Sequence, residues 1–264
     1  MTRRLLTEEA KAADLAWAFT RSSTLNFLAA GGPEIGGEET EMRLRMLLLS
    51  LLLGAATSVG CTQEATGPRV APPAAEISLP TPSLTGKVSV EEALAKRRSI
   101  RSFTQQDLSL QQVGQLAWAA QGITGERGQR TAPSAKAVYP LQLYLVKSDG
   151  VFRYVPEGHK LVKLSGSDVR TELSTQSSVR EAPLDFVIVA DSTKARASFG
   201  ERAERFTSIE AGHVAQNIHL QAVALGLGSV SVGGYKENDV TKALGLAAHE
   251  TALYVIPVGY PRPR

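Results

Sequence analysis

The sequence is poor in cysteine and has little excess of one charge. Both features limit the kinds of site and partner that the protein can have. Cys61 is the only cysteine, which excludes an intramolecular disulfide and any zinc site built from several thiolates. The 29 basic and 26 acidic side chains give a formal net charge of +3, too balanced to indicate a nucleic-acid partner. The 264 residues, 43% of them hydrophobic, suffice for one globular domain behind a leader segment.

Long hydrophobic runs are also scarce. The strongest, Met46–Ala56, is too short for a transmembrane helix, which needs about 20 apolar residues. Arg43 and Arg45 precede this run and small residues follow it up to Cys61, the order found in a secretory signal. The run also resembles a bacterial lipoprotein signal, in which the cysteine becomes the lipidated first residue. We therefore expect residues 42–61 to direct export to the bacterial cell envelope, with a lipid anchor at Cys61. The alternatives are a buried core helix and a cytoplasmic location.

Three further segments follow from this assignment. Residues 1–41 lie upstream of the signal, so we expect an upstream extension or a mis-assigned start. Residues 62–87 carry five prolines among Ala, Ser and Thr, a composition that predicts a disordered tether. The folded domain is then expected to cover residues 88–264.

Three Ser/Thr-x-x-Glu/Gln spacings, beginning at Ser89, Ser109 and Thr207, have the form of helix capping boxes. The expected helices cover residues 89–97, 109–121 and 207–225. Short apolar segments between Gly, Asp and Ser punctuation predict strands. The expected strands cover residues 141–146, 151–155, 186–190, 229–232 and 253–257, the first two forming a hairpin and the third lying centrally. Because no βαβ unit repeats, we predict an α+β fold rather than a doubly wound parallel sheet.

A cluster of three guanidinium groups and a hydroxyl is the first candidate for chemistry. Arg97, Arg98, Ser99 and Arg101 follow the first expected helix. Guanidinium groups match phosphate oxygens bidentately, so the cluster suits a phosphorylated cofactor. The alternative is a solvated basic face at a helix end, where cations favour the negative end of the helix dipole.

Two loops of small residues are further candidates. The first contains Pro133, Ser134 and Ala135, and its prolines favour a fixed loop that could approach a flat ligand closely. The second contains Gly233 and Gly234, which let a ligand approach the backbone or permit a positive φ. An ordinary loop and a plain turn are the alternatives.

Other site classes find little support. The glycine-rich stretch 225–235 is not a dinucleotide fingerprint, because Ser231 replaces the third glycine and the strand and helix come in the reverse order. No Gly-x-Ser-x-Gly elbow occurs, which argues against a serine hydrolase. Glu210 and His213 have the spacing of a carboxylate-bridged metal site but lack the second pair it needs, so we predict no metal and expect a core or interface role for His213.

Taken together and in order, these segments resemble the nitroreductase superfamily, specifically its branch of SagB-type and thiazole-oxidase-like dehydrogenases. The resemblance covers about residues 88–264 and is carried by four stretches: Arg97–Phe103, Leu116–Gly122, Thr131–Leu141 and Glu210–Tyr235. It implies a mixed sheet flanked by helices and a homodimer with FMN at its interface. It places Lys136 where relatives often have glycine.

The resemblance also implies roles for individual residues. The phosphate, ribityl and pyrimidine parts of FMN would contact Arg97, Arg98, Ser99 and Arg101. The flavin would be approached from the partner subunit by Pro133, Ser134 and Ala135, and the isoalloxazine ring would lie near Gly233 and Gly234. The phosphate would be closed off by a C-terminal basic residue, Arg262 or Arg264.

The implied function is hydride transfer from NADH or NADPH through the flavin to a nitro-aromatic, a quinone or a similar small-molecule acceptor. No catalytic side chain is assigned, since a flavin carries the redox chemistry and the protein supplies position and electrostatics. One alternative is a dehydrogenase of a modified peptide, although the sequence lacks the Lys-Tyr dipeptide typical of azoline-oxidising members. The other is a non-enzymatic, surface-tethered flavin-binding module.

Overall fold

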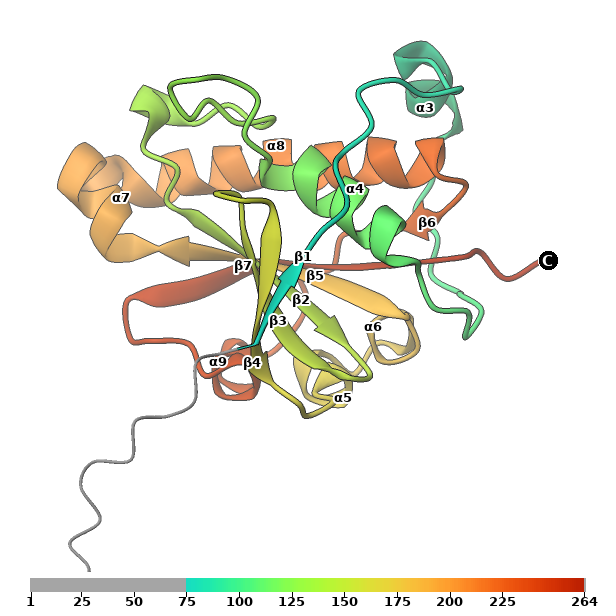
Figure 1. The fold of residues 1–264 in the computed structure, drawn as a ribbon. Helices are drawn as coiled ribbons and strands as arrows, with labels where there is room; N and C mark the ends of the chain where they lie inside the picture. The colour runs from blue at the N-terminus through green and yellow to red at the C-terminus, as the bar shows by residue number, and fades with distance from the viewer. Residues whose placement is uncertain (1–74, 264) are drawn as a thin grey trace, which may run out of the picture. The chain divides into compact units, whose positions relative to one another are not determined.

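The computed structural model describes residues 75–263, and these form an α+β domain around a seven-stranded sheet (Figure 1). The strand order is β1-β4-β3-β2-β5-β7-β6. The strands are β1 (Glu76–Ser78), β2 (Leu141–Lys147), β3 (Gly150–Val155), β4 (Lys160–Ser165), β5 (Leu184–Asp191), β6 (Gly228–Ser229) and β7 (Glu250–Gly259). The predicted hairpin is confirmed as β2–β3, which pair antiparallel from Tyr144–Arg153 to Lys147–Gly150.

Two sequence expectations about the sheet need correction. All neighbouring strands pair antiparallel, and parallel pairing within the described chain is limited to one bridge between Ser99 and Ser229, so the sheet is not mixed in the expected sense. The expected tether also contains structure, because β1 pairs with β4 and the side chain of Leu79 is buried. The folded domain therefore includes residues before Val88.

The α-helices are α3 (Val90–Lys96), α4 (Leu110–Gln121), α5 (Arg170–Leu173), α6 (Ser177–Arg180), α7 (Ser192–Phe199), α8 (Ala203–Ala224) and α9 (Glu237–Leu244), and two 3₁₀ turns are η1 (Ala135–Ala137) and η2 (Gly200–Arg202). The first two capping predictions are confirmed. Ser89 Oγ accepts a hydrogen bond from the backbone N–H of Glu92, and Ser109 forms a complete capping box with Gln112.

The third capping prediction was wrong. Helix α8 begins at Ala203, and Thr207 lies inside it. The hydroxyl of Thr207 donates to the carbonyl oxygens of Ala203 and Glu204, at 3.0 and 2.9 Å. A threonine can satisfy its hydroxyl this way within a helix, so the same spacing that marks a cap can also occur in a first turn.

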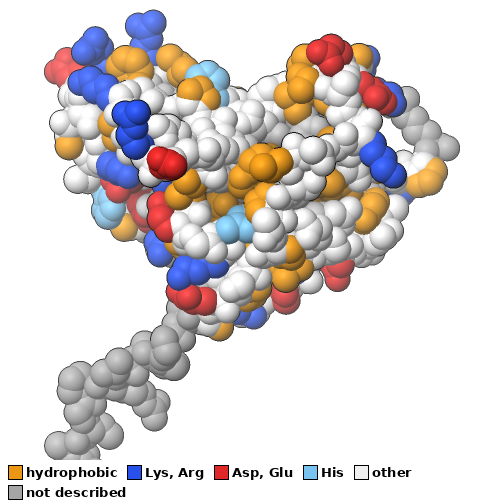
Figure 2. Space-filling view, turned by 45° about the horizontal axis from the view of Figure 1, so that its top comes forward, with side chains coloured by type: hydrophobic (Ala, Val, Ile, Leu, Met, Phe, Trp, Pro, Cys, Tyr) orange, Lys and Arg blue, Asp and Glu red, His pale blue; other side chains and the backbone are white. Residues whose placement is uncertain are grey.

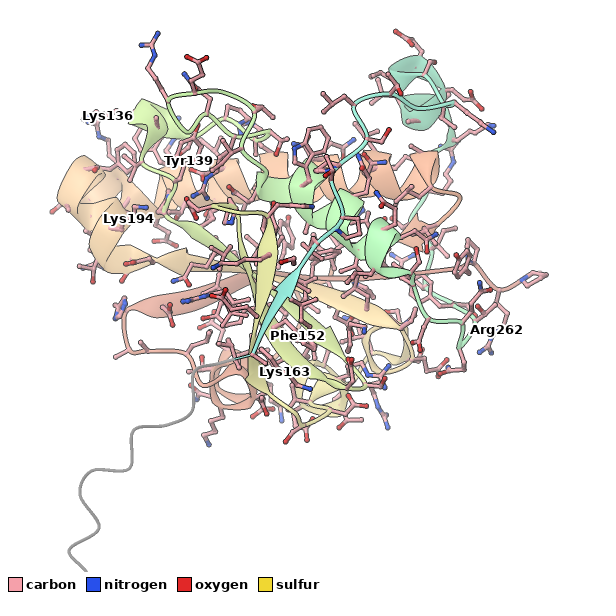
Figure 3. The ribbon with its side chains drawn as sticks, in the orientation of Figure 1. Lys136, Tyr139, Phe152, Lys163, Lys194 and Arg262 are labelled. Atoms are coloured by element: carbon pink, nitrogen blue, oxygen red, sulfur yellow. The ribbon has the colours of Figure 1, made fainter. Side chains whose placement is uncertain are left out.

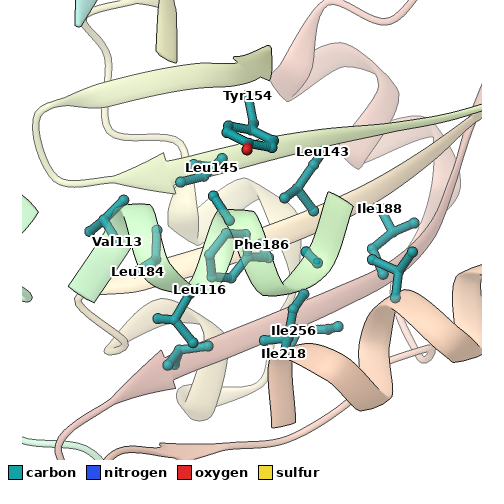
Figure 4. Packing of buried hydrophobic residues seen from close by; sticks show 14 of the residues in the cluster. Val113, Leu116, Leu143, Leu145, Tyr154, Leu184, Phe186, Ile188, Ile218 and Ile256 are labelled. Carbon is teal, nitrogen blue, oxygen red and sulfur yellow. The ribbon is translucent and has the colours of Figure 1, made fainter. Parts of the chain in front are cut away.

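Both faces of the sheet are covered, as Figure 1 shows for α4 and α8 on one side and α5, α6 and α9 on the other. The core between the sheet and the α4–α8 pair includes Leu116, Phe186 and Ile218 (Figure 4). A second core on the opposite face includes Val187 and Val189. Strand β5 thus buries alternate residues on opposite faces, which confirms its predicted central position and explains its continuous apolar sequence.

The predicted export signal, with Cys61, lies outside the described residues. Within residues 75–263, no helix has the length and hydrophobicity needed to cross a membrane.

Candidate functional site

The loop after α3 carries the predicted basic cluster and is fixed to strand β6. The backbone N–H of Ile100 donates to the carbonyl oxygen of Ser229 at 3.0 Å, beside the bridge between Ser99 and Ser229. Gly228 lets the loop lie this close, because a Cβ added there would come within 2.7 Å of the Ile100 side chain. The cluster is therefore held against the end of the sheet.

The C-terminal segment reaches the same loop. The backbone N–H of Arg262 donates to the carbonyl oxygen of Ser102 at 3.0 Å, and Pro261 pairs with the buried Phe103. A guanidinium nitrogen of Arg262 lies 4.0 Å from a carboxylate oxygen of Glu181. The structure thus brings Arg262 next to the 97–103 loop, whereas Arg264 lies outside the described residues.

Arg98 does not join this cluster. Its guanidinium donates to the carbonyl oxygens of Ala95 and Arg97, at 3.0 and 2.7 Å, and so covers the C-terminal end of α3. This is the helix-end interaction that cations favour, and it is the alternative the sequence left open. Arg98 thus takes the helix-end position in this structure, and its role toward a ligand stays a prediction, while Arg101 is exposed and half-buried Arg97 lies close to α8.

A buried histidine next to Arg97 was missed by the sequence analysis. His219 on α8 lies with Nδ1 2.7 Å from the hydroxyl of Ser229 and Nε2 2.8 Å from the hydroxyl of Ser231. Burial, reinforced by the positive charge of Arg97, lowers the pKa of His219 to about 4. The imidazole is therefore neutral at neutral pH, with one nitrogen donating and the other accepting.

Residues 229–234, called here the 229–234 segment, continue from β6 and pair with β7 at Val232. Ser231 contacts His219, and Gly233 lines a cavity of about 870 Å³ together with Thr207 and Ser208. Ser231 and Gly233 are two residues apart, so their Cα atoms lie no more than about 7 Å from each other. Ser231 and Gly233 are both exposed. A polar, basic end and a glycine end are thus joined by one extended segment.

The backbone conformation does not require glycine at positions 233 and 234. Neither has a positive φ. A Cβ added at Gly233 would approach only Tyr254, at 4.0 Å, and one added at Gly234 would approach only Gln176, at 3.7 Å, both ordinary contacts. A conformation with positive φ is therefore excluded for these two residues, and a plain turn stays an alternative. No described residue fills the space where a side chain at Gly233 or Gly234 would lie. This open space suits a ligand that approaches the backbone.

The loop containing Pro133, Ser134 and Ala135 is anchored to α8 at a different place. Ser134 Oγ donates to Oε2 of Glu210 at 2.5 Å and accepts from the backbone N–H of Tyr139 at 2.9 Å. Pro133 is exposed, and Ser134 and Ala135 are half-buried. Within one chain, this loop therefore does not meet the basic cluster.

The same loop is strained. Lys136, Ala137 and Tyr139 have φ values of 53°, 54° and 49°, a region that residues with a Cβ rarely adopt. Lys136 stands where the family resemblance implies glycine, and its left-handed backbone gives the physical reason for that preference. The anchoring hydrogen bonds of Ser134 hold a conformation that the sequence alone disfavours.

Glu210, which anchors the loop, is itself buried at 4% exposure. Burial raises the pKa of its carboxyl group, and the hydrogen bond from Ser134 partly opposes that rise. Oε1 of Glu210 and Nε2 of Gln121 are both buried without a hydrogen-bond partner. Oε1 of Gln121 accepts from Arg130 at 3.0 Å, which extends the polar network to the start of the loop. His213, by contrast, is exposed, so it is not a core histidine.

An apolar groove of about 510 Å³ lies between the segment before α3 and helices α3, α4 and α8. Its lining includes Val90, Trp118 and Leu220. Figure 2 shows the surface hollowed between two raised parts, with hydrophobic side chains gathered in and beside the hollow. Leu84 and Val90 are 82% and 65% exposed at this groove. Such a contiguous apolar surface is typical of a protein–protein contact.

The domain has an α+β fold. The basic 97–101 loop lies at one end of the 229–234 segment, and Gly233 and Gly234 lie at its other end. Residues 94–260 match the nitroreductase family, so the chain belongs to that family and is an oxidoreductase. The structure describes no cluster of metal-binding side chains among residues 75–263.

Two relatives support this assignment, and a more distant structure shares the fold. A protein of Methanocaldococcus jannaschii, provisionally named a nitroreductase, is 37% identical over 194 residues, covering 70% of this chain and 96% of the relative. A provisionally named nitroreductase of Ralstonia eutropha superposes with a TM-score of 0.68 at 31% identity, covering 73% of this chain and 94% of the other. An NADPH:FMN oxidoreductase of Vibrio harveyi, solved with NAD⁺, shares the fold at 21% identity and a TM-score of 0.50, covering 66% and 72%.

Proposed function

We propose that the protein is an FMN-dependent oxidoreductase that takes hydride from NADH or NADPH and passes it to a nitro-aromatic, a quinone or a similar acceptor. The observation that carries the proposal is the pairing, on one extended segment, of the basic 97–101 loop with the side-chain-free surface at Gly233 and Gly234. A basic loop beside a surface without side chains suits a ligand with a phosphate at one end and a flat ring at the other.

The residues at the basic end fit a phosphate-bearing flavin. Arg97, Arg101 and Arg262 supply guanidinium groups that can hold phosphate oxygens. A neutral imidazole donates to one hydroxyl and accepts from the other, so one of Ser229 and Ser231 keeps its own hydrogen free. Ser231 is the exposed member of the pair. We assign its hydroxyl to the ribityl chain or the phosphate, with His219 as the residue that orients it.

The glycine end fits the ring. A flat isoalloxazine could lie against Gly233 and Gly234 without meeting a Cβ, and the adjoining cavity of about 870 Å³ leaves room for a second small molecule. Bound flavin would supply the hydride exchange, and the chain would supply its position and electrostatics. The name of the Vibrio harveyi protein, and the NAD⁺ in its structure, support both the flavin and the nicotinamide donor.

A homodimer is part of the proposal. The apolar groove beside α4 and α8, with exposed Leu84 and Val90 at its edge, offers a surface that a second copy of the chain would cover. The strained loop, anchored at Glu210, would then extend Pro133, Ser134 and Ala135 toward the flavin held by the partner subunit. The narrower resemblance to SagB-type dehydrogenases, and with it a modified-peptide substrate, stays a prediction.

Export and lipid anchoring also stay a proposal, resting on the order of residues 42–61. In a bacterial host, labelling with a fatty-acid analogue should mark the full chain and leave the Cys61→Ala variant unmarked and shifted out of the membrane fraction. An unlabelled, soluble wild-type chain that retains residues 46–60 would contradict this proposal and leave the enzyme in the cytoplasm.

The proposed reaction is tested by anaerobic titration of the purified full chain with NADH and with NADPH. We expect the visible flavin absorption to be lost with at least one donor and to return when a nitro-aromatic or a quinone is added. Flavin that dithionite reduces but neither nicotinamide reduces would contradict the proposed donor.

A further inference from the structure

A smaller cavity, of about 230 Å³, lies where the loop before β2 meets the adjoining ends of β2 and β3. Its lining includes three cationic residues, two tyrosines and one acidic residue, namely Arg130, Arg153, Lys194, Tyr139, Tyr154 and Glu157. None of these residues belongs to the candidate flavin site. Figure 3 shows Tyr139 and Lys194 at one end of the molecule and Arg262 at the opposite end.

Two of the three cations are fixed in place by neutral groups. Arg130 donates to Oε1 of Gln121 at 3.0 Å, and its guanidinium carbon lies 4.8 Å from the centre of the Tyr139 ring. Lys194 Nζ donates to the carbonyl oxygen of Tyr139 at 3.0 Å. These partners orient the cations without cancelling their charge, which is the arrangement that pre-organises a site for an anion.

Carboxylates compensate this charge poorly. Arg130, whose side chain is 14% exposed, lies 3.5 Å from Glu157, whose side chain is 67% exposed, so solvent weakens this one ion pair. Arg153 and Lys194 form no ion pair with any residue between 75 and 263. Elsewhere on the same domain, cations have close partners, as for Arg170 with Asp168 at 2.6 Å. The cavity therefore carries a local excess of positive charge.

We propose that this cavity binds a small organic carboxylate. Guanidinium groups match a carboxylate in shape and charge, and the tyrosine rings with Leu141, Leu143 and Pro156 offer an apolar wall to the rest of the ligand. A cavity of this volume is below the usual range for drug-sized ligands, so a nucleotide does not fit. The site is separate from the flavin site and does not depend on the proposed function.

The test uses benzoate as the probe and benzamide as its neutral counterpart, each titrated calorimetrically into the purified full chain. Benzoate should bind saturably and benzamide should not. The Arg153→Gln/Lys194→Gln double variant should weaken benzoate binding by about a hundredfold or more, because each charge-assisted contact contributes about tenfold or more. The matched control is Lys147→Gln/Lys163→Gln, which removes two cations that lie near the ring of Phe152 and do not line this cavity. Figure 3 labels Phe152 and Lys163.

Equal binding of benzoate and benzamide would overturn the proposal, as would a double variant that binds benzoate like the wild type. Inorganic phosphate, titrated in the same way, is the third arm. If phosphate binds to the wild type and not to the double variant, and benzoate does not bind, the occupant is an inorganic oxyanion. That result would also overturn the proposal. The single variants Arg153→Gln and Lys194→Gln, checked by thermal unfolding, replace the double variant if that one does not fold.

Discussion

Ser134 and Glu210, 76 positions apart in the chain, meet with 2.5 Å between Oγ and Oε2. The contact ties the strained loop before β2 to the middle of α8. Removing the hydroxyl leaves a buried carboxyl group without its donor, so Ser134→Ala should cost about 1–3 kcal/mol of unfolding free energy. Urea unfolding measures this loss.

The pKa of Glu210 adds a pH signature. Since burial raises this pKa in the folded state, the stability that the neutral carboxyl group contributes is lost as pH rises from the unfolded value, about 4.5, through the folded pKa. The Glu210→Gln variant cannot ionise, so its stability relative to the wild type should improve as pH rises over that range. A difference that is constant with pH would show that the carboxyl group titrates as in the unfolded chain.

The open space at Gly233 predicts that a side chain there affects flavin binding and leaves the fold unchanged. A Cβ at this position meets no close neighbour within the described residues, so flavin-free Gly233→Val should have the thermal stability of the flavin-free wild type and yet bind no flavin. Gly166→Val is the matched control, because Gly166 also has a clear Cβ position and no positive φ. Flavin fluorescence after gel filtration separates the two variants. Full flavin retention by Gly233→Val would place the ring elsewhere.

The basic cluster can be divided by its contacts. Each charge-assisted hydrogen bond to a phosphate contributes about 1.5–3 kcal/mol, so Arg97→Ala/Arg101→Ala should weaken FMN binding by a factor of about 100 or more. Arg98→Ala is the internal control: its guanidinium covers the end of α3, so we expect a small loss of stability and unchanged FMN affinity. Equal effects from Arg98 and from the pair would place Arg98 in the site.

His219 predicts a loss of stability in mild acid. The unfolded chain protonates this histidine below a pKa of about 6.5, whereas the folded chain does so only near 4, so stability falls as pH decreases between these values. The difference corresponds to about 3 kcal/mol. Unfolding of flavin-free protein at pH 7 and pH 4.5 should show a steeper decline for the wild type than for His219→Asn. Parallel declines would contradict a buried, neutral His219.

The elements that the sequence predicted correctly are those with local signals. The caps at Ser89 and Ser109 depend on residues three positions away, and β5 on an unbroken apolar run. Strand β4 was missed because Lys160 and Lys163 interrupt its apolar residues. Helix α9 was missed although Gly245 ends it with a φ of 64°, a stop signal that was present in the sequence.

The candidate site divides in the same way. The 97–101 loop and the glycine pair were found because their residue types are informative on their own. Glu210 was assigned to a helix cap and His219 was not singled out, because their hydroxyl partners, Ser134, Ser229 and Ser231, come from other segments of the chain. Arg98 could not be separated from Arg97 by sequence, since only the direction of its side chain decides the matter.

The flavin content of the purified full chain tests the central claim most directly. The protein should be yellow, and acid denaturation should release FMN, identified by mass spectrometry, at one molecule per chain once the protein is saturated. The basic loop and the glycine surface, at opposite ends of the 229–234 segment, are the physical reason for this expectation. A folded, colourless protein that takes up no FMN would contradict the account.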